Sequence, residues 1–136
     1  MNNLKQMLIE HEGLRLRPYQ CSAGKLTIGV GRNLEDRGIS SDEALMLFDN
    51  DMKDAIKDAM TLKWFPKLNP ARQGVIVDMI FNLGLGRFLL FKKTTALMAV
   101  GDYEGAAAEM LNSKWAGQVG KRATRLAQMM TTGKWV

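Results

Sequence analysis

The spacing of hydrophobic residues along the chain predicts a short helix followed by a small β-hairpin. Apolar residues recur at helical spacing over residues 3–11, and Gly13 is typical of a residue just past a helix end. From residue 14 to residue 32, apolar residues instead alternate with polar residues and glycines on both sides of Ser22-Ala23-Gly24. This alternation around turn-forming residues predicts two extended segments paired as a hairpin.

Two glycines, Gly29 and Gly31, occupy alternate positions at the end of the second extended segment. Because glycine has no side chain, another part of the chain or a ligand can approach the backbone closely at such positions. The two glycines are therefore candidates for a close contact.

The rest of the chain is predicted to be helical. Ser40 followed by Glu43 is a capping-box pattern, which predicts the start of a long amphipathic helix. Trp64-Phe65-Pro66 ends this helix, and Asn69-Pro70 begins another, which is apolar on nearly every side, ends at Gly84 and belongs at the centre of a bundle. Three further helices are predicted over about 94–100, 102–112 and 121–130.

No repeat, low-complexity tract or linker divides the chain, so we expect one domain over residues 1–136 with an α+β, mostly α fold. Its two lobes are a hairpin lobe with the long connecting helix, about 12–60, and a helical lobe built from about 1–11 with 61–136. The hairpin separates the first helix from the others, and we expect this helix to pack back on the helical lobe. A cleft between two such lobes favours a polymeric substrate over a small buried one.

Composition excludes several kinds of protein. The 46% of hydrophobic residues is too high for a disordered chain and ordinary for a globular one. One cysteine and one histidine exclude an internal disulfide and a Cys/His zinc cluster, and no metal or cofactor is predicted. The net charge of +5 predicts an anionic partner, but a nucleic acid is not expected, because the chain lacks a clustered recognition helix or an aromatic-basic motif.

No segment has the pattern of a targeting signal or a membrane span. The N-terminus lacks the apolar core and small-residue cleavage site of a signal peptide. The most apolar stretch, residues 74–91, is interrupted by charged residues and glycines, so no stable membrane insertion is expected. We expect synthesis in the cytoplasm and, for any action outside the cell, a separate means of release.

Three residues around the predicted hairpin carry candidate chemistry. Glu12 lies at the end of the first helix beside apolar residues, and a partly apolar site holds the proton of a carboxylic acid to higher pH, which suits a general acid. A hairpin folded at Gly24 brings Cys21 and Thr27 toward each other, because each lies three positions from the turn. The three side chains are therefore expected to surround one point.

The same residues resemble the active-site region of phage-type lysozymes, glycoside hydrolase family 24. The resemblance is carried by Glu-Gly-Leu-Arg-Leu-Arg-Pro-Tyr at 12–19 and Thr-Ile-Gly-Val-Gly at 27–31. The family pattern of Glu, eight residues, Asp or Cys, five residues and Thr is met by Glu12, Cys21 and Thr27. Similarity continues to the C-terminal Thr-Gly-Lys-Trp segment and so covers nearly the whole chain.

The resemblance implies an endolysin, a muramidase of host cell lysis, that hydrolyses the β-1,4 bond between N-acetylmuramic acid and N-acetylglucosamine in the peptidoglycan glycan strand. Glu12 protonates the leaving oxygen, and Cys21 and Thr27 hold the water that attacks the opposite face of the sugar, with inversion. No metal or cofactor is implied. The chain is expected to be a monomer and to depend on a membrane-perforating holin for access to the wall.

Similarity also implies supporting roles outside the hairpin. Phe81 and Thr94 match residues of the sugar groove, and Arg122, at the start of the last helix, matches an arginine that pairs with the catalytic glutamate. The segment 33–39 is much shorter than the hairpin lobe of some family members, so sugar contacts made from that lobe are not expected here.

The role of Cys21 stays open between two alternatives. A free thiol has a pKa of about 8.5 and is mostly a weak hydrogen-bonding group at neutral pH, which suits positioning of a water. If Lys25 or Arg32 lowers that pKa, the thiolate instead acts as a base. A covalent cysteine intermediate is the less favoured possibility.

Two other functions stay open as well. A lytic transglycosylase uses a single acid and fits the absence of a second carboxylate in the pattern. A non-catalytic wall-binding protein or phage tail component has the same scaffold, and the intact Glu12 argues against it.

Overall fold

The computed structural model describes residues 1–136, which divide into two compact units, Met1–Leu47 and Phe48–Val136. Both the helical content and the small sheet agree with the predicted α+β, mostly α fold. None of the helices combines the length and the apolar character that crossing a bilayer requires. The expected association of residues 1–11 with 61–136 stays a prediction.

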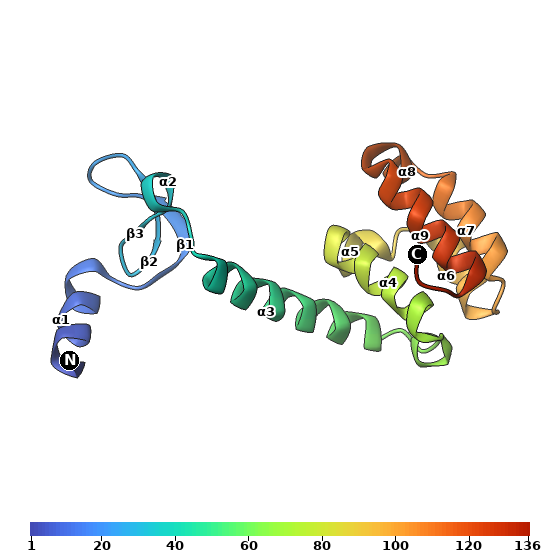
Figure 1. The fold of residues 1–136 in the computed structure, drawn as a ribbon, viewed down its shortest axis with the longest axis horizontal. Coiled ribbons are helices and arrows are strands. Elements are labelled where there is room, and N and C mark those ends of the chain that lie inside the picture. The colour runs from blue at the N-terminus through green and yellow to red at the C-terminus, as the bar shows by residue number, and fades with distance from the viewer. The chain divides into compact units, whose positions relative to one another are not determined.

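The N-terminal unit contains a short helix and a three-stranded antiparallel sheet (Figure 1). Its elements are α1 (Asn2–Glu12), β1 (Arg15–Gln20), β2 (Leu26–Gly29), β3 (Arg32–Asn33), α2 (Leu34–Arg37) and the start of α3 (Ser41–Met60). The sequence predicted only two strands. The chain turns again after β2 and adds β3, which pairs Ile28 with Arg32, so β2 becomes the central strand.

The pairing of β1 with β2 is interrupted by a change of register. Tyr19 lies opposite Thr27, whereas Arg15 lies opposite Gly29, so the register shifts between Arg15 and Tyr19. Pro18 falls in this interval, and a proline, which has no N–H to donate, is tolerated on an edge strand at such an irregularity. The Arg15 guanidinium lies 4.4 Å from the centre of the Tyr19 ring. Thr27 lies outside this irregular interval, paired with Tyr19 beside the turn that joins β1 to β2.

The segment between the sheet and the long helix is folded rather than open. The Asn33 side chain caps α2 by accepting a hydrogen bond from the Asp36 N–H. Glu35 Oε1 accepts a hydrogen bond from the backbone N–H of Leu26 at 2.8 Å. Strand β3 has only two residues and ends before it can pair with Leu26, so the Glu35 side chain satisfies this N–H of β2. The short connection of residues 33–39 therefore makes a helical turn against the sheet.

The predicted capping box at the start of α3 is confirmed. The Glu43 N–H donates to Ser40 Oγ at 3.2 Å, and the Ser40 N–H donates to Glu43 Oε1 at 2.9 Å. Arg32 donates to both carboxylate oxygens of Glu43, at 2.9 and 2.8 Å, which joins β3 to the first turn of α3. Hydrogen bonding from Arg32, followed by that from Ser40, lowers the pKa of Glu43 to about 2.

The C-terminal unit is a helix bundle, drawn from green to red in Figure 1. Beyond α3 its elements are η1 (Phe65–Lys67), α4 (Pro70–Leu83), α5 (Leu85–Phe88), α6 (Lys92–Ala99), α7 (Tyr103–Leu111), α8 (Lys114–Val119) and α9 (Lys121–Thr132). Asn69 caps α4 as predicted, and Asp102 caps α7. The sequence did not predict α5 and α8, because four- and six-residue helices are too short to show a helical period.

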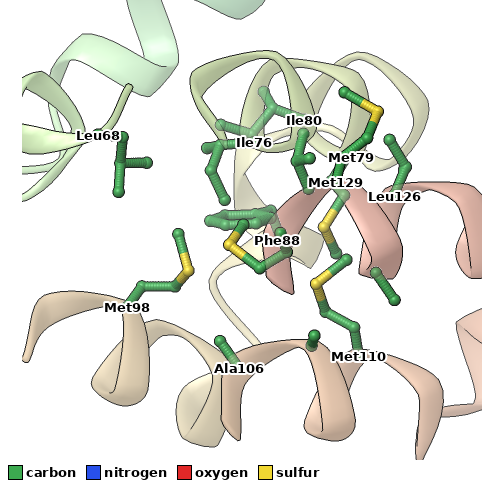
Figure 2. Close-up of a cluster of buried hydrophobic side chains, with 14 of the residues drawn as sticks. Leu68, Ile76, Met79, Ile80, Phe88, Met98, Ala106, Met110, Leu126 and Met129 are labelled. Atoms are coloured by element: carbon green, nitrogen blue, oxygen red, sulfur yellow. The ribbon is translucent and has the colours of Figure 1, made fainter. Parts of the chain in front are cut away.

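The core of this unit is built around α4, as its apolar sequence predicted. Five residues of α4 are buried, and Figure 2 shows side chains of α4, α6, α7 and α9 gathered around Phe88. Methionines account for much of this core, as expected of flexible side chains that fill irregular gaps. The buried methionines are Met79, Met98, Met110, Met129 and Met130.

Candidate active site

Glu12 is the last residue of α1, and its side chain lies on the turn between β2 and β3. A Cβ added to Gly31 in that turn would lie 2.6 Å from Glu12 Oε2 and 2.9 Å from Glu12 Cδ. The expectation of a close approach is thus confirmed at Gly31, and the approaching group is the carboxylate. At Gly29 nothing lies within 4 Å of an added Cβ.

The surroundings of Glu12 in the N-terminal unit are open. Glu12 is exposed, and its expected apolar neighbours Leu14 and Leu16 are themselves 62% and 83% exposed. Within this unit no hydrogen bond or ion pair holds the Glu12 carboxylate. The position of the Glu12 carboxylate is therefore set by its contact with the backbone of Gly31.

Cys21 and Thr27 meet at the other end of β2, as the hairpin spacing predicted. The turn between β1 and β2 is closed by the Cys21 N–H donating to the Lys25 carbonyl at 2.9 Å and the Gly24 N–H donating to the Cys21 carbonyl at 2.8 Å. Thr27 is only 3% exposed, and its hydroxyl donates to the Lys25 carbonyl at 2.9 Å. The Cys21 sulfur lies within hydrogen-bonding reach of the same hydroxyl. The turn thus places a half-buried thiol beside a buried hydroxyl.

The pKa of the Cys21 thiol is lowered, mainly by hydrogen bonding from the backbone at Lys25 and then at Ala23. Partial desolvation opposes this lowering. The direction agrees with the base alternative for Cys21, but the cause differs from the expected cationic side chains. The Lys25 ammonium pairs with Asp36 at 3.5 Å, and Arg32 pairs with Glu43. Backbone dipoles, which carry no sequence signature, stabilise the thiolate.

Alkylation of Cys21 by iodoacetamide is expected to reach half its maximal rate at a pH below the value of about 8.5 found for a free cysteine. A lowered pKa leaves more thiolate at a given pH, and the thiolate is the reactive form. The measurement is the alkylation rate, followed by mass spectrometry from pH 6 to pH 10. Thr27→Val is the matched variant and should keep the midpoint below 8.5, because the backbone donors remain. A wild-type midpoint at or above 8.5 would contradict the assignment.

The residues expected to support the substrate lie in the C-terminal unit. Phe81 on α4 is 43% exposed, and its ring packs edge-on against Phe48, with 5.8 Å between the ring centres. It lines a surface hollow together with Asp51, Asp54 and Asp58 of α3. Phe81 therefore combines a packing contact with an accessible ring face, which keeps its predicted sugar contact available.

Thr94 lies in the first turn of α6 and is only 2% exposed. It lies at the bottom of a hollow whose rim includes Lys93, Asn112 and Ser113. A direct sugar contact by Thr94 stays a prediction, and in this structure the polar rim residues are the accessible groups.

Arg122, at the start of α9, forms an ion pair that the sequence did not predict. Its Nε donates to Asp78 Oδ1 at 2.8 Å, and both side chains are partly exposed. Asp78 lies on α4 in the most apolar stretch of the chain. A charged residue in such a stretch is expected to have an ion-pair partner, and this was the feature of the sequence that could have predicted the pair. The Asp78 contact fixes Arg122 on the surface of α4, and the proposed pairing of Arg122 with Glu12 stays a prediction.

Comparison with known proteins agrees with the resemblance in the sequence. The sequence profile described as phage lysozyme matches residues 9–129, a range that includes every candidate site residue. A protein named "Endolysin" from Acyrthosiphon pisum secondary endosymbiont phage 1 is 31% identical over 121 residues, covering 85% of this chain and 80% of that protein.

Two longer matches show how this chain differs from its relatives. "Probable T4-type lysozyme 1" of Dictyostelium discoideum is 29% identical, covering 98% of this chain and 96% of its own length. "Pre-baseplate central spike protein Gp5" of Enterobacteria phage T4 is 27% identical over 96% of this chain but only 28% of its own length. Both alignments extend over 163 positions, more than the 136 residues here, so these relatives contain segments that this chain lacks. With its profile match over residues 9–129 and its mostly helical fold with a small sheet, this chain belongs to the phage lysozyme family.

Proposed function

We propose that this protein hydrolyses the β-1,4 bond between N-acetylmuramic acid and N-acetylglucosamine in peptidoglycan, with inversion at the sugar carbon. The observation that carries the proposal is the placement of Glu12 at one end of strand β2 and of Cys21 with Thr27 at the other. Membership in the phage lysozyme family supports a glycan substrate. The net charge of +5 suits the anionic wall polymer.

In the proposed reaction Glu12 acts as the general acid. It donates its proton to the glycosidic oxygen as the bond from that oxygen to the sugar carbon breaks, and a water adds to the carbon from the opposite face. The proton released by the water returns to the Glu12 carboxylate by way of solvent, so the enzyme ends the cycle unchanged. An exposed glutamate at a helix end can exchange protons with solvent without further groups.

Cys21 and Thr27 are proposed to hold the attacking water. The hydroxyl hydrogen of Thr27 is donated to the Lys25 carbonyl, so the oxygen of Thr27 is left with lone pairs that accept from a water. The Cys21 sulfur is a second acceptor, and its lowered pKa favours this role. A water that donates to both acceptors keeps a lone pair of its own free to attack the sugar.

Inversion is proposed because Glu12 and the two groups that hold the water lie toward opposite ends of β2. An inverting glycosidase keeps its acid and its base about 6.5–9.5 Å apart, which leaves room for the attacking water, whereas a retaining enzyme keeps them about 5 Å apart.

Groups outside the sheet complete the proposed site: Phe81 supplies a ring face for the sugar, and Thr94 lies under a polar rim. The proposed support of Glu12 by Arg122 rests on the family resemblance alone, because the ion pair that Arg122 forms is with Asp78. The protein acts as a monomer in host cell lysis and reaches the wall with the help of a holin. The similarity to an endolysin supports this setting, and the similarity to a spike protein supports a tail component as the alternative.

Analysis of the reaction products is the experiment that tests the proposal. Digestion of purified peptidoglycan is expected to release fragments with a reducing N-acetylmuramic acid end, heavier by one water than anhydro fragments, as mass spectrometry measures. Early spectra by NMR should show the α-anomer first, because inversion of a β bond produces it. Anhydro ends would identify a lytic transglycosylase, and absence of fragments from folded protein would identify a non-catalytic wall binder. Either result contradicts the proposal.

A further inference from the structure

Two glycines flank Val30 where β2 turns into β3: Gly29 is the last residue of β2, and Gly31 lies in the turn. Gly29 and Gly31 both have positive φ, 71° and 67°, a conformation that L-residues with a Cβ adopt with strain. A Cβ at Gly29 meets nothing within 4 Å, whereas a Cβ at Gly31 overlaps the end of the Glu12 side chain. The positive φ alone explains the glycine at position 29. At position 31 the Glu12 side chain is a second reason, because it leaves no room for a Cβ.

The overlap at Gly31 involves the reactive end of Glu12. The three nearest atoms are Oε2 at 2.6 Å, Cδ at 2.9 Å and Cγ at 3.1 Å. All three belong to the far end of a flexible side chain, so an added methyl group would displace the carboxylate rather than the backbone. Such a displacement has little effect on folding. Its effect on a reaction is large, because a misplacement of about 1 Å can lower a rate by roughly 100-fold.

We infer that Gly31 is a positioning residue for Glu12: the bare Cα of the turn is the surface on which the carboxylate rests in its working position. The inference rests on the proposed role of Glu12 as general acid. No hydrogen bond or ion pair within the N-terminal unit performs this task, so the shape of the turn does. Gly31 acts only through Glu12, because it contributes no side chain to the reaction and contacts no substrate.

The test compares Gly31→Ala with Gly29→Ala. Both variants have the same backbone strain, and both are expected to lower Tm by a similar few degrees. Gly31→Ala is expected to lower kcat by roughly 10- to 100-fold with KM within about twofold, because the acid moves while the substrate contacts remain. Gly29→Ala is expected to keep at least about half of kcat. Equal losses of kcat in the two variants would overturn the inference.

A second arm asks whether the effect acts through Glu12. An aspartate side chain is one carbon shorter than glutamate. In a Glu12→Asp protein, the carboxylate therefore no longer overlaps the methyl group that Gly31→Ala adds. There, Gly31→Ala is expected to change kcat by less than about twofold. A full loss in that background would mean that Gly31 acts on something else, which contradicts the inference. If Gly31→Ala does not fold, Gly31→Asn adds the same Cβ on a residue that accepts positive φ more readily.

The two ways of failing are distinguishable. Activity that survives Glu12→Gln would overturn the proposed function, whatever Gly31 does. Activity lost in Glu12→Gln, but equally retained in the two glycine variants, would overturn only the role of Gly31.

Discussion

Glu12→Gln is expected to lower kcat for peptidoglycan hydrolysis by roughly 10²–10⁴-fold, the range that a general acid supplies. Glutamine has nearly the same shape and rests on Gly31 in the same way, but it has no proton to donate to the leaving oxygen. The loss should therefore appear in kcat with little change in KM. The measurement is the clearing of a suspension of chloroform-treated Gram-negative cells, with released reducing ends as the quantitative assay.

The chain contains a matched control for this substitution. Glu10 is an exposed glutamate on the same helix, two positions before Glu12. Glu10→Gln removes the same charge and is expected to keep activity within about twofold, because an exposed carboxylate away from the turn contributes only a screened, long-range field. A similar loss in both variants would show that the net charge, rather than proton donation at Glu12, controls the rate.

Cys21→Asp is expected to retain activity within roughly tenfold of the wild type, whereas Cys21→Ala is expected to lose about 10- to 100-fold. An aspartate at this position meets the backbone donors that now stabilise the thiolate, and it accepts a hydrogen bond from the same water. Alanine leaves Thr27 as the only acceptor. The measurement is kcat at neutral pH with purified peptidoglycan.

Ser22 is the matched position for the Cys21 variants, since it is exposed and lies in the same turn. Ser22→Asp adds the same charge without reaching Thr27, and it is expected to keep activity within about twofold. If Cys21→Asp were as inactive as Glu12→Gln, the water-positioning role of Cys21 would be refuted. If Cys21→Ala kept full activity, Thr27 alone would hold the water, and the thiol would be dispensable.

Local chemistry in the sequence was enough to predict most helix boundaries. The capping box at Ser40 and Glu43, and the cap and proline at Asn69 and Pro70, are confirmed. These predictions succeed because a cap bonds backbone groups within three or four residues, so residue type and spacing contain the information. Strand β3 and the short helix α5 lack such a pattern, whereas α8 has a cap at Ser113 but is too short to show a helical period.

The candidate site divides in the same way. The residue types available for catalysis and the closeness of Cys21 to Thr27 could be predicted from the order of residues, because a short turn leaves a hairpin few ways to pair. The folded structure was needed to show that Glu12 rests on Gly31, that backbone amides lower the pKa of Cys21, and that Asp78 holds Arg122. The first and third depend on contacts between segments that are far apart in the chain. The second depends on the direction in which a turn points its backbone N–H groups, which residue types alone do not specify.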